Sequence, residues 1–158
     1  MKQETANSRK VILEVICSLL MLLFLYASVT KLLDLQTFRH DMLNQPFPKW
    51  FAHILVWWVP TLEIALTIGL VIEGTRRYAL WGSLILMFLF TLYTSLALAH
   101  AFRYVPCSCG GIIKRLNWRQ HFALNLAFTV LAFSGIRLHK KTQQRSSNDI
   151  QSKKMSFS

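Results

Sequence analysis

Charged residues are scarce in this chain of 158 residues: they make up 16% of the sequence, against 53% for hydrophobic residues. A soluble domain of this length mixes more charge among its apolar residues. Here the charges separate long apolar runs, and the mean hydropathy is +0.36. The pattern indicates one small multi-spanning membrane domain and excludes an ordinary soluble protein.

The sequence also lacks a basic helix with interleaved aromatic residues, although its formal net charge is +11. We therefore expect no nucleic-acid partner. Lys and Arg residues that flank membrane spans explain the charge more simply, because positive residues gather on the cytoplasmic side of a membrane protein.

Four apolar segments can cross a bilayer as helices, which takes about 20 residues. They do not alternate as the strands of a membrane barrel do. We predict an all-α fold, a polytopic four-transmembrane-helix bundle over residues 1–138, and a basic, disordered cytoplasmic tail over 139–158. The predicted spans are about 11–29, 51–72, 79–99 and 119–138.

The distribution of Lys and Arg predicts the orientation of these spans. Eleven of the 18 residues lie in the two tails and the loop between the second and third spans, and seven lie on the other side. Both termini are therefore expected in the cytoplasm, with the loop before the fourth span in the periplasm, where disulfides persist. The first span is too long for a cleaved signal peptide, and we expect it to be retained.

Cysteine is rare as well, with three residues in the chain. Cys17 lies alone in an apolar run, which is typical of a small buried hydrophobic residue. Cys107 and Cys109 lie in VPCSCGG (105–111), near basic residues that favour the reactive thiolate. A disulfide across one intervening residue closes a strained, easily reduced ring. These features favour redox chemistry over a structural disulfide, which stays open as an alternative.

His100 and His121 flank this loop, and two Cys with two His can hold zinc tetrahedrally. The spacing matches no standard zinc motif, and an oxidising compartment disfavours thiolate ligands. We therefore predict no metal site here.

Polar residues gather in the outer halves of the predicted spans, below the cysteine loop. Glu63 lies near the middle of its span, where an ionisable side chain is costly and marks a functional site or an interhelical hydrogen bond. A histidine at this depth can carry protons for thiol exchange, whereas Asn125 can simply join two helices. The supporting residues that we predict are Lys31, Glu63, His100, His121 and Asn125.

Three motifs, in this order and spacing, resemble the MauE/DoxX-like membrane proteins: KLLD after the first span, PTLE in the second, and CSCG before the fourth. The likeness runs from about Leu13 to Ile136. It implies a redox-associated four-helix protein of the bacterial inner membrane, with Cys107 and Cys109 as the family's cysteine pair. Lys31 and Glu63 match its recurrent polar positions. Family members often carry an aromatic residue after the second cysteine, where this chain has glycine, which leaves the partner open.

The resemblance implies a thiol–disulfide role, so the chain is expected to be an oxidoreductase or redox relay. Its partner would be a periplasmic thioredoxin-like or disulfide-containing protein. A membrane quinone near Trp57, Trp58 and Tyr93 is the candidate electron carrier, by analogy with other small four-helix redox proteins. The alternative is a non-catalytic helical subunit that docks on and stabilises a larger membrane transport or secretion complex.

Overall fold

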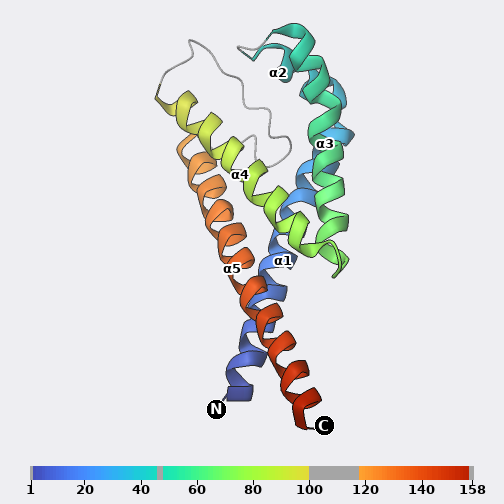
Figure 1. Ribbon diagram of the computed structural model, residues 1–158. Coiled ribbons are helices and arrows are strands. Elements are labelled where there is room, and N and C mark those ends of the chain that lie inside the picture. The colour runs from blue at the N-terminus through green and yellow to red at the C-terminus, as the bar shows by residue number, and fades with distance from the viewer. Residues whose placement is uncertain (1, 46–47, 100–117, 157–158) are drawn as a thin grey trace.

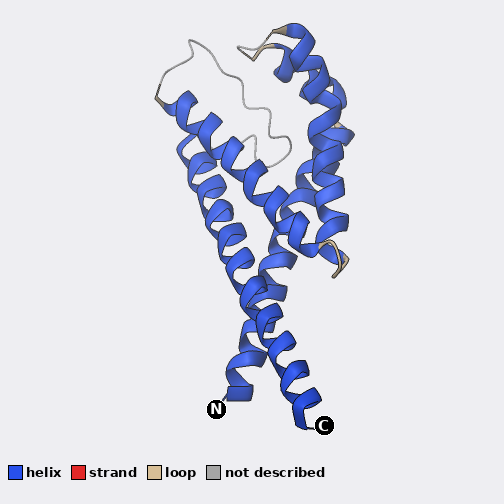
Figure 2. Ribbon diagram, viewed as in Figure 1, coloured by secondary structure: helices blue, strands red, loops and turns tan. Residues whose placement is uncertain are grey.

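The computed structural model describes residues 2–45, 48–99 and 118–156, with side chains over 8–45, 48–99 and 119–144. These residues form helices and no strand, which confirms the all-α class (Figure 2). The helices are α1 (Lys2–Leu33), α2 (Leu35–Leu43), α3 (Lys49–Val71), α4 (Arg76–Leu98) and α5 (Trp118–Ser156).

Four of the helices are long and apolar enough to cross a membrane. These candidate spans have 23 to 26 residues each, and a helix needs about 20 to cross the hydrocarbon core. The predicted four-span bundle is therefore confirmed, with span ends that differ by a few residues from the predicted ones. The spans are Ser8–Leu33, Lys49–Val71, Arg76–Leu98 and Arg119–Gln144.

The last helix differs from the sequence-based expectation. α5 continues to Ser156, through a tail that was expected to be disordered because it is polar and basic. The sequence contains neither Gly nor Pro between Arg137 and Ser156, and these are the residues that oppose a helix most strongly. The helix can therefore extend beyond the apolar span.

The long helices alternate in direction, so both termini lie at one end of the bundle and α2 lies at the other (Figure 1). We call these the terminal end and the α2 end. α4 packs mainly on α5 and α1 mainly on α3, while α1 with α5 and α3 with α4 join the two pairs. The end of α4 and the beginning of α5 therefore both lie at the α2 end.

The apolar core lies toward the terminal end and is built around one face of α1. The buried residues of α1 recur every three or four positions, as one face of a helix requires. Cys17 belongs to this face and is 1% exposed, as predicted for a buried hydrophobic residue. The core comprises Leu13, Ile16, Cys17, Leu20, Phe24, Leu70, Ala79, Leu80, Met87 and Ala132.

The same face of α1 becomes polar toward the α2 end. Ser28 and Lys31 follow Phe24 at helical spacing and are equally buried. α2, which the sequence analysis did not identify, begins directly after α1 at the N-cap Asp34, whose Oδ1 accepts a hydrogen bond from the Thr37 amide at 3.2 Å. Asp is a preferred N-cap residue, so a signal for this helix was present.

Gly135 of α5 lies where three helices meet. A Cβ atom at this position would lie 3.1 Å from Leu80 Cδ2 and 3.2 Å from Ile16 Cγ2. Small residues of this kind let membrane helices approach closely.

We predict that Gly135→Val destabilises the protein by about 1–3 kcal/mol, because the added methyl groups overpack this junction. Gly74→Ala is the matched control, since a Cβ there meets nothing within 4 Å. Thermal unfolding in detergent measures both variants, and equal midpoints would contradict the packing described here.

Candidate functional site

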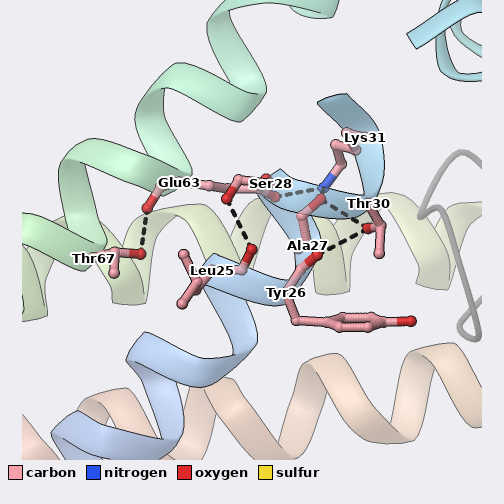
Figure 3. Close-up of polar contacts among 8 residues, drawn as sticks. All are labelled: Leu25, Tyr26, Ala27, Ser28, Thr30, Lys31, Glu63 and Thr67. Atoms are coloured by element: carbon pink, nitrogen blue, oxygen red, sulfur yellow. Dashed lines mark hydrogen bonds and ion pairs between the residues drawn. The ribbon is translucent and has the colours of Figure 1, made fainter. Parts of the chain in front are cut away.

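The polar site centres on an ion pair between α1 and α3. Lys31 Nζ lies 2.6 Å from Glu63 Oε1, and the two residues are 5% and 1% exposed (Figure 3). Glu63 continues the buried face of α3 three residues after the buried Pro60. Two residues that the sequence marked separately, 32 positions apart, thus form one site.

Lys31 has three neighbours for its ammonium group. Besides Glu63, it donates a hydrogen bond to the carbonyl oxygen of Ala27 at 3.4 Å. Its Nζ also lies 5.9 Å from the ring centroid of Phe38, the buried residue of α2, within the range of a cation–π contact. Lys31 therefore connects α1, α2 and α3 through one side chain.

One of the two carboxylate oxygens of Glu63 has a hydrogen-bond donor among the described residues, and the other has none. Its Oε1 accepts from Lys31, whereas Oε2 is buried and has no hydrogen-bond partner within the described part of the chain. Its backbone carbonyl accepts from Thr67 Oγ1 at 2.8 Å (Figure 3). A buried acceptor without a donor costs free energy, so an unpaired carboxylate oxygen of this kind is unusual in a folded protein.

Hydroxyl groups line the end of α1 beside this pair. Ser28 is fully buried and donates to the carbonyl oxygen of Leu25 at 3.0 Å. Thr30 Oγ1 donates to the Tyr26 carbonyl at 2.9 Å and to the Ala27 carbonyl at 3.1 Å (Figure 3). Such bonds satisfy hydroxyl groups inside a membrane helix.

A second polar group lies between α4 and α5. His121 and Asn125 are buried, with 1% and 7% exposure, on one face of α5 as their spacing predicted. Further along the same pair of helices, Thr91 Oγ1 and Thr129 Oγ1 lie 3.0 Å apart. The sequence analysis did not mark these two threonines, which only their helical spacing to other buried residues would indicate.

The Tyr93 side chain of α4 reaches the segment that directly follows α2. The sequence analysis had grouped this residue with Trp57 and Trp58. Its hydroxyl donates to Oε1 of Gln45, a buried residue that the sequence analysis missed. Trp57 and Trp58 are 62% and 60% exposed on α3. The two tryptophans therefore lie on the outer surface of α3.

Cys107, Cys109 and His100 lie outside the described residues. The described positions that flank them, Ala99 and the beginning of α5, both lie at the α2 end of the bundle. Within the residues whose positions are given, no three His, Cys, Asp or Glu side chains are grouped as metal ligands.

One family model, described as methylamine utilisation protein MauE, matches residues 9–138. The match includes all three predicted motifs and most of each membrane span. No curated protein and no solved structure matches the chain.

We predict that Lys31→Met and Glu63→Met each lower the free energy of unfolding by about 3–5 kcal/mol, because each leaves a buried charge without its partner. The double variant should lose less than the sum of the two, since it buries no unpaired charge. Reversible unfolding in mixed detergent provides the double-mutant cycle.

Glu14→Gln is the control for this cycle. Glu14 Oε1 lies 3.3 Å from Arg76 Nη1, but Glu14 is largely exposed, so its ion pair is worth about 0–1 kcal/mol. Single Lys31 and Glu63 variants that match this small effect would show that the buried pair does not stabilise the fold.

Proposed function

The chain belongs to the MauE family of methylamine utilisation proteins, and we propose from this premise that it is a membrane thiol–disulfide redox protein. In this proposal, Cys107 and Cys109 exchange disulfides with a thioredoxin-like or secreted partner. The family description supports a redox context for a membrane protein of this kind.

The proposed exchange follows ordinary thiol chemistry. One cysteine thiolate attacks a sulfur of the partner's disulfide, forming a mixed disulfide and releasing the partner's other sulfur as a thiolate. The second cysteine of the chain then attacks the mixed disulfide and frees the partner as a dithiol. Two electrons pass to the partner, and the C-x-C pair becomes a disulfide. The reverse sequence oxidises the partner instead.

The observation that carries the proposal is the position of the polar residues. The buried Lys31–Glu63 pair and the buried residues His121 and Gln45 lie toward the α2 end, where the segment with the cysteines joins α4 to α5. Histidine titrates near neutral pH, so His121 is suited to moving protons when thiols ionise.

A membrane quinone is the proposed electron carrier. When the exchange runs in the direction that oxidises the partner, a quinone would take up the two electrons and two protons that the C-x-C dithiol releases as it returns to the disulfide. Trp57 and Trp58 are exposed on α3, so a quinone that diffuses in the bilayer can contact them without entering the bundle. Aromatic side chains offer stacking contacts to such a flat ring.

We predict that Cys107→Ser or Cys109→Ser traps the partner as a mixed disulfide in cells, because the remaining cysteine attacks but no second thiol resolves the intermediate. Non-reducing gels and mass spectrometry identify the trapped species. Cys17→Ser is the control, because Cys17 is buried in the apolar core and should leave trapping unchanged.

Failure of both single variants to trap a protein, together with full function in cells, would overturn the redox proposal. That result would favour the alternative, a non-catalytic subunit of a larger membrane complex.

We also predict the orientation from the excess of positive residues in the tails and in the loop after α3. Green fluorescent protein fused after Ser158 should fluoresce, because both termini are proposed to be cytoplasmic. Alkaline phosphatase fused at the same position should be inactive. The opposite pair of results would place the cysteine loop in the cytoplasm and remove the oxidising compartment from the proposal.

A further inference from the structure

Oε2 of Glu63 is the buried side-chain oxygen that lacks a hydrogen-bond partner among the residues with described side chains. Less than 1 Å² of this atom is accessible to solvent in the structure. An ionised carboxylate with one unmatched oxygen is costly in an apolar environment, and neutralisation relieves that cost. A proton is the smallest ligand that neutralises the carboxylate.

We propose that Glu63 is a reversible proton-binding site within the membrane, in which Oε2 takes up the proton while Oε1 keeps its hydrogen bond from Lys31. The pair is neutral overall when Glu63 is ionised. It carries one positive charge, on Lys31, when Glu63 is protonated. This site rests on the ion pair and not on the thiol chemistry proposed above, so either can fail without the other.

The surroundings of Lys31 allow both states. Besides Glu63, the ammonium group has the Ala27 carbonyl at 3.4 Å and the Phe38 ring centroid at 5.9 Å. Protonation of Glu63 therefore leaves Lys31 with a polar acceptor, an aromatic face and the neutral carboxyl oxygen. If Glu63 were the single neighbour of Lys31, protonation of Glu63 would remove most of the interactions that stabilise the ammonium group.

Few other charges act on this site among the residues whose side chains the structure describes. α3 packs against α1, α2 and α4, and Lys31 is the charged group from these helices that interacts with Glu63. On α2, Arg39 and His40 are exposed, and Asp41 lies 3.8 Å from His40. The buried side chains of α4 are uncharged, and Arg76 at its terminal end pairs with Glu14. Among the described side chains, Lys31 is therefore the main partner that acts on the proton of Glu63.

Infrared spectroscopy of the full chain in lipid vesicles tests the proposal, because a neutral carboxyl group has its own C=O stretching band. We expect a band that grows as the pH falls, because protonation converts the Glu63 carboxylate into a neutral carboxyl group. The band should shift in D₂O, since the proton exchanges. It should vanish in Glu63→Gln and persist in Glu73→Gln, the exposed control in the loop after α3.

Two further variants keep the test decisive if Glu63→Gln does not fold. Glu63→Asp retains a carboxyl group and should move the band rather than abolish it. Lys31→Met removes the cation that favours the ionised state, so the band should persist to a higher pH than in the wild-type chain. A wild-type band of constant intensity without a deuterium shift, or no band that depends on residue 63, would overturn the proposal.

Discussion

A carboxylate within a membrane helix needs a cation, and the contact between Glu63 and Lys31 is the constraint on which the arrangement of α1, α2 and α3 depends. The pair lies 2.6 Å apart and is almost fully buried. Removal of either partner leaves an uncompensated charge in an apolar environment. Because Lys31 also contacts Phe38, the same interaction holds α2 against the bundle. The packing of Leu13 to Phe24 and, nearer the α2 end, the ion pair of Lys31 together fix the rotation of α1 about its axis.

The buried face of α1 divides the bundle into two parts with different chemistry. From Leu13 to Phe24 this face is apolar and packs with α3, α4 and α5 in the core. At Ser28 and Lys31 it becomes polar, and the buried polar residues of α5 lie toward the same end. Apolar packing thus dominates in the core, while the buried polar residues Ser28 and Lys31 of α1 and His121 and Asn125 of α5 lie nearer the α2 end. The matched family model, over residues 9–138, spans both parts of the bundle.

Hydropathy alone predicted the four spans, because a run of about 20 predominantly apolar residues is typical of a transmembrane helix. The cost of burying Glu63 likewise marked it as a site residue. Its pairing with Lys31 was not predictable, since the two residues lie 32 positions apart and only packing brings them together. α2 is short and only weakly apolar, so hydropathy did not reveal it. The exposure of Trp57 and Trp58 depends on which face of α3 packs inward, which Glu63, Val56 and Val59 decide together.

The central functional claim is that Cys107 and Cys109 change redox state as a pair. Alkylation in denaturant, followed by mass measurement of the intact protein with and without prior reduction, tests it most directly. Cys17, free and buried in the apolar core, provides a constant internal label. The account predicts one alkyl group per chain before reduction and three after it, for the three cysteines of the sequence. Three alkyl groups in both samples, whatever oxidant is applied, would contradict it.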